Sequence, residues 1–310
     1  MATPRSLDVV VPVYNEAPCI DKFYHSLLAE LEGLQIPFRV LYVNDGSQDE
    51  TQALLIGLAQ ADERVVVLEL SRNFGHQAAI TCGLDAASAD WVLTMDGDGE
   101  HPPEKIPEMV ALATQGFDLV LVQRQEAQSI SWFKRATSDG FYRILGQITS
   151  TPILSGVGDF RLMSHAVVEA MKAMPEYHRF LRGMVAWVGF RTAILPYTPA
   201  ARMGGTSKYS FKKMTRLAID AVYSFSLAPI FAVMAAGMVF LLAAVAAGVV
   251  GLAQLNHAPT WNPLLVFLLL LCTGVLLVAL GGIGIYIGLI FQQVKERPVY
   301  LLRSVSNQKS

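Results

Sequence analysis

Residues 92–103 read VLTMDGDGEHPP, a short apolar run that leads directly into acidic side chains and stops at two prolines. The acids are Asp96, Asp98 and Glu100, at alternate positions. Carboxylates this close repel one another, and a bound cation is the usual remedy. Hard oxygen ligands of this kind suit Mg²⁺ or Mn²⁺, which commonly take one or two carboxylates together with substrate phosphates. The stretch therefore predicts a buried strand that ends in a divalent-metal site.

Apolar runs of the same kind alternate with helix-period segments along the first 124 residues. The runs LDVVVPVYN, FRVLYVND, VVVLEL, WVLTMD and LVLVQR begin at residues 7, 38, 65, 91 and 119. Helices are expected between them, near residues 20–34, 51–61, 77–87 and 103–115. Strands this apolar, separated by helices, indicate an α/β domain with a mostly parallel sheet covered on both faces.

Polar residues follow each of these strands. They are Tyr14–Glu16, Asn44–Ser47, Ser71–Asn73, Asp96–Glu100 and Arg124. In open α/β sheets ligands bind beyond the carboxyl ends of the strands, so these residues are expected to converge on one site. Neither a GxGxxG nor a GxxxxGK[ST] pattern occurs, so the usual glycine-rich phosphate cradles are absent from the sequence.

Composition narrows the class of protein. The chain has 310 residues, 53% hydrophobic and 16% charged, with a net charge of −2, which argues against a nucleic-acid partner. Its three cysteines lack CxxC spacing and support neither a disulfide framework nor a zinc site. The apolar run at the N-terminus is short and breaks at Pro12, so no signal peptide is expected.

Two long uncharged segments, residues 226–255 and 263–291, each exceed the ~20 residues that cross a bilayer. We expect two transmembrane helices, the alternative being a buried helical hairpin of a soluble protein. Basic residues flank the pair, and the connecting loop has none. By the positive-inside rule both ends are cytoplasmic. The flanking residues are Lys208, Lys212, Lys213 and Arg216 before the spans, and Lys295, Arg297 and Arg303 after them.

The remaining boundaries follow from these segments. Residues 1–208 form the α/β domain and residues 292–310 a cytoplasmic tail. Residues 209–225 have basic and apolar residues at roughly helical spacing, as in a helix that lies on an anionic membrane surface. An ordinary amphipathic helix packed on the α/β domain is the alternative.

Several motifs, in order, resemble known enzymes. VPVYNE (11–16), NDGSQDET (44–51) and a strand ending in DxD resemble the GT-A nucleotide-sugar glycosyltransferases of family 2, which have a Rossmann-like fold. MDGDGEHPPEKIP (95–107), GDFRLM (158–163), HRFLRGMVAWVGF (178–190) and RMGGTSKYSF (202–211) are similar to polyprenyl-phosphate glycosyltransferases. That group includes dolichyl-phosphate mannose synthase and bacterial undecaprenyl-phosphate glucosyltransferases.

The resemblance implies a donor site on the first, second and fourth strands. Pro12, Tyr14, Glu16 and Asp45 would contact the nucleotide, although turn chemistry alone also explains NDGS. Asp96 and Asp98 resemble the DxD motif and would contact the nucleotide sugar and its metal, with Glu100 as a further ligand. The family often has Gln where this chain has Glu100, which adds a negative charge. The alternative is a solvated acidic turn that caps the following helix.

Four residues would grip the acceptor phosphate by the same resemblance: Arg124, Lys134, Arg135 and Ser138. Arginine suits this role because it donates two parallel hydrogen bonds to a phosphate. A solvated basic face is the alternative. Glycines beside Arg202 and Lys208 suggest a loop that would bring both cations to the departing diphosphate. Their alternative is simple attraction to anionic lipid.

Asp159 in GDFRLM resembles the position proposed as the catalytic base. A phosphate monoester has a second pKa of about 6, so the acceptor needs little deprotonation and Asp159 could instead position it. A structural ion pair with Arg161 is the alternative role. His76, a lone histidine after the third strand, is more often structural than a donor contact.

The resemblance implies inverting, metal-dependent transfer of a sugar from a nucleotide-diphosphate sugar to the phosphate of undecaprenyl phosphate at the bacterial inner membrane. Glucose from UDP-glucose is the preferred choice. GDP-mannose, UDP-GlcNAc and UDP-aminoarabinose are alternative donors. A non-catalytic nucleotide-sugar-binding partner of a lipid flippase is the alternative class. Relatives imply a homo-oligomer, with a tetramer among the options.

Overall fold

The computed structural model describes residues 5–124, 156–176, 179–197 and 263–307, with isolated positions between 235 and 246. The chain forms two compact units. One comprises Met1–Ser210 together with Pro298–Ser310, and the other comprises Phe211–Arg297.

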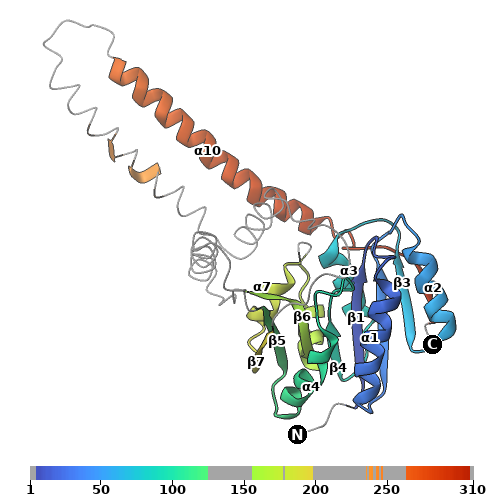
Figure 1. Cartoon of the computed structure of the whole chain (residues 1–310). Helices are drawn as coiled ribbons and strands as arrows, with labels where there is room; N and C mark the ends of the chain where they lie inside the picture. The colour runs from blue at the N-terminus through green and yellow to red at the C-terminus, as the bar shows by residue number, and fades with distance from the viewer. Residues whose placement is uncertain are drawn as a thin grey trace, which may run out of the picture. The chain divides into compact units, whose positions relative to one another are not determined.

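The first unit is built on an eight-stranded sheet in the order β7-β5-β6-β4-β1-β2-β3-β8 (Figure 1). The five predicted apolar runs all form strands in it, and the prediction of an α/β sheet is confirmed. They are β1 (Leu7–Val13), β2 (Phe38–Asn44), β3 (Val65–Leu70), β4 (Trp91–Thr94) and β5 (Leu119–Arg124).

Three further strands make the sheet mixed. They are β6 (Val157–Ser164), β7 (Thr192–Tyr197) and β8 (Leu302–Ser306). β6 lies antiparallel between β4 and β5, β7 pairs parallel with β5, and β8 pairs antiparallel with β3. Strands β1 to β5 therefore all run in one direction, and their carboxyl ends share one edge.

Part of the predicted tail thus belongs to the sheet. Ser304 Oγ donates to Glu69 Oε2 at 2.7 Å, and Arg303 forms an ion pair with the same side chain at 3.2 Å. Tyr300 Oη donates to Asp85 on the helix that follows β3, at 3.0 Å. These contacts attach residues 300–307 to the α/β unit.

Helices cover both faces of this sheet (Figure 1). On one face lie α1 (Ile20–Gly33), α2 (Thr51–Ala61) and α4 (Ile106–Thr114), which a short 3₁₀ turn, η1 (Pro103–Lys105), precedes. On the other lie α3 (His76–Ala86), α6 (His165–Lys172) and α7 (Leu181–Trp187). Every residue of β1 is buried, as expected of a central strand.

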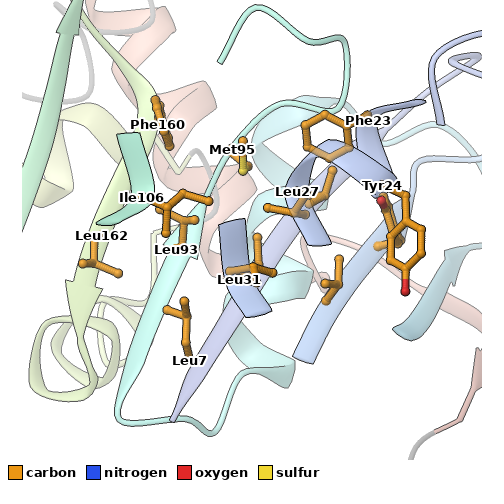
Figure 2. Close-up of a cluster of buried hydrophobic side chains, with 14 of the residues drawn as sticks. Leu7, Phe23, Tyr24, Leu27, Leu31, Leu93, Met95, Ile106, Phe160 and Leu162 are labelled. Atoms are coloured by element: carbon orange, nitrogen blue, oxygen red, sulfur yellow. The ribbon is translucent and has the colours of Figure 1, made fainter. Parts of the chain in front are cut away.

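The core beneath the first face anchors the acidic loop after β4. Figure 2 shows Met95 beside Leu27 and Phe23 of α1, and all three are buried. Phe160 of β6 lies in the same cluster. Side chains alternate between the faces of a strand, so Asp96, next to Met95, and Asp159, next to Phe160, are directed to the other face.

One described helix is long and apolar enough to cross a membrane. It is α10 (Pro263–Val294), in which residues Leu271–Val294 form the candidate span. Leu269, Leu276 and Leu280 are exposed rather than packed against protein. Of the first predicted span, only isolated helical positions between 235 and 246 are described, and the rest lies outside the described residues, as does most of 209–225.

A close approach between two loops gives a stability test. Gly46 has φ of +67°, and a Cβ there would lie 2.5 Å from the carbonyl carbon of Arg72. Gly46→Ala should therefore lower the free energy of unfolding by about 2 kcal/mol or more. Gly57 is exposed within α2 and has open space around it, so Gly57→Ala should raise it by about 0.5–1 kcal/mol.

Urea unfolding of the purified full chain in detergent, followed by circular dichroism, measures both variants. Equal stability of Gly46→Ala and the unmodified protein would contradict the close packing of the two loops.

Candidate active site

The shared carboxyl edge brings the predicted polar residues together. The loops after β1 and β2 are joined by two hydrogen bonds. Asn15 N–H donates to Ser47 Oγ at 3.0 Å, and Gln48 N–H donates to Asn15 Oδ1 at 2.8 Å. Asn15 adopts a positive φ of 54°, which asparagine tolerates better than most residues. The predicted nucleotide contacts Tyr14 and Glu16 flank it and are half-buried.

Asp45 links the loop after β2 to the start of α3. Its carboxylate accepts from Phe74 N–H at 2.7 Å and from Gly75 N–H at 3.0 Å. Both donors lie just before the first turn of α3, where unpaired amides favour a negative charge. Burial raises the pKa of Asp45, and these two hydrogen bonds partly offset the rise.

The acidic loop after β4 is held by three local contacts. His101 Nδ1 accepts from Asp96 N–H at 2.9 Å, and Asp98 Oδ1 accepts from Glu100 N–H at 3.0 Å. Gly97 lies tightly on β1, where an added Cβ would come 3.0 Å from Val13 Cγ1. His101 is itself buried and stacks on Phe160. The loop is thus fixed at its ends while its two aspartates stay half-buried.

The donor set of this loop fits a metal that has few protein ligands. Asp96 Oδ1 is buried and accepts no hydrogen bond, and its ion pair with His76 is long at 3.5 Å, so this hard oxygen can accept a metal ion. Among the described residues no group of three or more Asp, Glu, His or Cys side chains is arranged as a metal cage. Such a site suits Mg²⁺ or Mn²⁺ completed by substrate phosphates and water, rather than a metal held by protein alone.

Asp159 lies at the centre of a charge cluster on β6, the strand that pairs with β4. Its side chain is 4% exposed and forms ion pairs with Arg161 of β6 and, at 3.2 Å, with Arg182 of α7. His76 Nε2 is 3.3 Å from Asp159 Oδ2 and 3.5 Å from Asp96 Oδ1. The cluster therefore extends from α7 through β6 to the acidic loop.

Nearby charges outweigh burial in setting the pKa values of Asp159 and His76. Burial alone would raise the pKa of the Asp159 carboxyl, but Arg182, His76 and Arg161 hold it well below its usual range. Partial desolvation would lower the pKa of His76, whose side chain is 41% exposed, but the carboxylates of Asp96 and Asp159 raise it to about 9. Asp159 is thus ionised and already engaged by two guanidinium groups, which makes it a weak proton acceptor.

The other predicted residues divide into those the structure describes and those it does not. Pro12 is buried in β1, and Arg124 at the end of β5 has Nη1 4.0 Å from Glu100 Oε2. Lys134, Arg135, Ser138, Arg202 and Lys208 lie outside the described residues. The ion pair between Asp159 and Arg161, weighed as an alternative role, is present.

Sequence reasoning missed three residues of this edge. His76 was taken as a lone structural histidine, and the contacts of His101 and Arg182 were not anticipated. The available signal for Arg182 was its place in the motif HRFLRG, and His101 directly follows the acids. For His76 the chain offered only its position after a strand, because its partners come from β4 and β6.

Comparison with known proteins agrees with this arrangement. The sequence profile described as "Glycosyl transferase family 2" matches residues 8–171, more than half of the chain. An uncharacterized glycosyltransferase of Synechocystis is 36% identical over 300 residues, which cover 96% of this chain and 94% of that protein. The chain therefore belongs to glycosyl transferase family 2 and is a glycosyltransferase.

Two further relatives have names that specify an activity. An SfII prophage-derived bactoprenol glucosyl transferase of Shigella flexneri is 35% identical over 302 residues, covering 96% of this chain and 97% of that protein. A prophage bactoprenol glucosyl transferase homolog of Escherichia coli K12 is 34% identical over 304 residues, which cover 96% of this chain and 99% of that protein.

A solved structure of Mycobacterium tuberculosis glucosyl-3-phosphoglycerate synthase with Mn²⁺, UDP-glucose and phosphoglyceric acid overlaps with a TM-score of 0.48. It is 20% identical, and the overlap covers 71% of this chain and 78% of that chain.

The charge cluster predicts a large effect of removing its central carboxylate. Asp159→Ala would leave Arg161, which is 2% exposed, with no carboxylate at that position. Breaking a buried ion pair on one side typically costs about 3–5 kcal/mol. Thermal unfolding of the full chain should show this loss, whereas Glu104→Ala at an exposed position should not change stability measurably. Unchanged stability of Asp159→Ala would contradict the role of the cluster.

Proposed function

We propose that the protein transfers a sugar from a nucleotide-diphosphate donor to the phosphate of a polyprenyl phosphate, with inversion at the anomeric carbon. UDP-glucose and undecaprenyl phosphate are the best choices of substrate. The support is the family membership, the names of the bactoprenol glucosyl transferase relatives, and their near-complete coverage of this chain. No observation favours the non-catalytic flippase partner.

The observation that carries the proposal is the acidic loop after β4, which contains Asp96, Asp98 and Glu100. Asp96 Oδ1 is buried without a hydrogen-bond partner, beside Asp98 and at the carboxyl edge where α/β enzymes bind ligands. Asp96 and Asp98 would hold Mg²⁺ or Mn²⁺, with Glu100 as a further ligand. When bound, the divalent ion would neutralise charge on the donor diphosphate.

The loops after β1 and β2 would bind the nucleotide. In this proposal Pro12, Tyr14 and Glu16 line the base pocket. Asp45 has both oxygens engaged by backbone amides, so it would hold the base or ribose through its remaining lone pairs while it fixes the start of α3. The same residue would then couple donor binding to the position of the neighbouring helix.

The acceptor phosphate would enter beside the acidic loop. Arg124 lies close to Glu100, within reach of the acidic edge, and would grip the phosphate together with Lys134, Arg135 and Ser138. A phosphate oxygen then attacks the anomeric carbon from the side opposite the diphosphate. Arg202 and Lys208 would stabilise the negative charge that develops on the leaving diphosphate.

Asp159 would act by position rather than as a base. Its pKa is well below the usual range, and its oxygens are engaged by Arg161 and Arg182. An acceptor phosphate has a second pKa of about 6 and is largely dianionic at neutral pH. The nucleophile therefore carries its own charge, and Asp159 would order the cationic groups near it.

The C-terminal part would anchor the enzyme to the bacterial inner membrane. α10 would be one of two spans, with 226–255 as the other and both chain ends in the cytoplasm. Exposed apolar side chains along α10 are what contact with lipid requires. The anchor would keep the site near the lipid phosphate, and a homo-oligomer such as a tetramer would pack the spans together.

Substitution of the second aspartate tests the metal assignment. Asp98→Ala should reduce transfer to undecaprenyl phosphate by about a hundredfold to a thousandfold, because a cation-binding carboxylate at the reacting diphosphate is lost. The assay incubates purified full-length protein with MnCl₂, undecaprenyl phosphate and radiolabelled donors, and then extracts the lipid. Glu104→Ala, an exposed acid on the next segment, is the matched control.

Three results are decisive. Label from UDP-glucose in the lipid fraction, lost in Asp98→Ala and on EDTA treatment, is expected. Turnover retained in Asp98→Ala would contradict the metal assignment. Bound but unconsumed donor would contradict transfer itself.

The pH dependence tests which group carries the reactive charge. If the acceptor phosphate is its own nucleophile, the rate should fall below about pH 6, where the phosphate gains a proton. An acceptor phosphonate has a higher second pKa, so this acid limb should move to higher pH with it. If the rate falls at the same pH with both acceptors, a group of the protein titrates instead, and the prediction is wrong.

A further inference from the structure

Two site carboxylates lie close together where β4 ends beside β6, because His76 Nε2 is within 3.5 Å of both Asp96 and Asp159. In the antiparallel pair of β4 and β6, Leu93 lies opposite Leu162 and Thr94 opposite Arg161. Continuing this register by two residues brings Asp96 opposite Asp159. A hydrogen bond supports the continuation, because Thr94 Oγ1 donates to the backbone oxygen of Asp159 at 2.5 Å.

Opposed like charges on neighbouring strands destabilise a sheet unless a cation separates them. Asp159 is balanced by Arg161 and Arg182 on its own side. Asp96 Oδ1 is buried and accepts no hydrogen bond. The imidazole of His76 lies between the two acids, with Nε2 3.5 Å from Asp96 Oδ1 and 3.3 Å from Asp159 Oδ2.

The position of His76 is itself fixed by the site. It is the first residue of α3, directly after Gly75, whose N–H donates to Asp45. Asp45 therefore holds the start of α3 from one side, and the charge cluster around Asp159 meets His76 from the other. The loop after β2 therefore contacts Gly75, and the loop after β4 contacts the imidazole of His76, the next residue.

We propose that His76 is a positioning residue of the donor site, which holds the Asp96 carboxylate against the cluster of Asp159, Arg161 and Arg182. In this role it contacts protein carboxylates and not the reacting atoms. The inference rests on the proposed function, because it assigns Asp96 to binding of the nucleotide diphosphate. Without His76, Asp96 would face Asp159 unscreened and would rotate away from its binding orientation.

Paired substitutions distinguish the effect of the hydrogen-bond donor of His76 from the effect of its size. The amide nitrogen of His76→Gln can take the place of Nε2, whereas His76→Met has a similar length and no donor. His76→Asn keeps an amide but is too short to reach both acids. His25→Met, at an exposed position on α1, is the control for general effects of losing a histidine.

Calorimetric titration of the full-length enzyme with UDP in the presence of MnCl₂ gives a readout independent of turnover. His76→Met and His76→Asn should weaken UDP binding roughly tenfold, the scale of a hydrogen bond to a charged group. His76→Gln should lose less, about threefold, because its amide keeps a hydrogen-bond donor between the acids but not the positive charge of the imidazolium. Kinetically, the KM for the sugar donor should rise while the KM for the polyprenyl phosphate stays unchanged.

The outcomes distinguish the inference from the function on which it rests. If the unmodified enzyme binds UDP with Mn²⁺ and His76→Met and His76→Asn bind equally well or more tightly, His76 does not position Asp96. A rise in KM for both substrates would also overturn the inference, because it would indicate a general loss of structure. If the unmodified enzyme binds no UDP with Mn²⁺, the proposed donor site fails, and this inference fails with it.

Discussion

The meeting of β4 and β6 is the constraint on which the rest of the site depends. Asp96 follows the end of β4, and β6, running in the opposite direction, carries Asp159, so that His76 Nε2 lies within 3.5 Å of both carboxylates. Two carboxylates there are tolerable only because cations surround them, and the structure supplies Arg161, Arg182 and His76. The cations come from β6, α7 and α3. The local charge balance therefore ties together three elements that are distant in sequence.

The hydrophobic core explains why this charged arrangement is held so firmly. Met95 and Phe160 are both buried on the opposite face, next in sequence to the two acids. Because side chains alternate along a strand, packing these two residues under α1 and α4 directs Asp96 and Asp159 to the face of α3 and α7. The orientation of the acids thus follows from apolar burial, and the ion pairs select which charges surround them.

The part of the fold that could be predicted from sequence is the part whose strands are continuously apolar. β1 to β5 and the acidic turn after β4 were found because buried parallel strands leave an unmistakable run of aliphatic residues. β6 was not predicted as a strand, because Asp159 and Arg161 interrupt its apolar pattern. β8 escaped because LRSVS, an exposed edge strand, has too few apolar residues to stand out. The family resemblance identified Asp159, but the role of His76 needs the β4–β6 register, which no local pattern specifies.

A crystal of the full-length protein grown with UDP and MnCl₂, with data collected at the manganese absorption edge, tests the central claim most directly. The account predicts an anomalous peak for manganese within coordination distance of Asp96 or Asp98, with the diphosphate of UDP next to it. Manganese and nucleotide bound away from the end of β4, or absent at saturating concentrations, would contradict it.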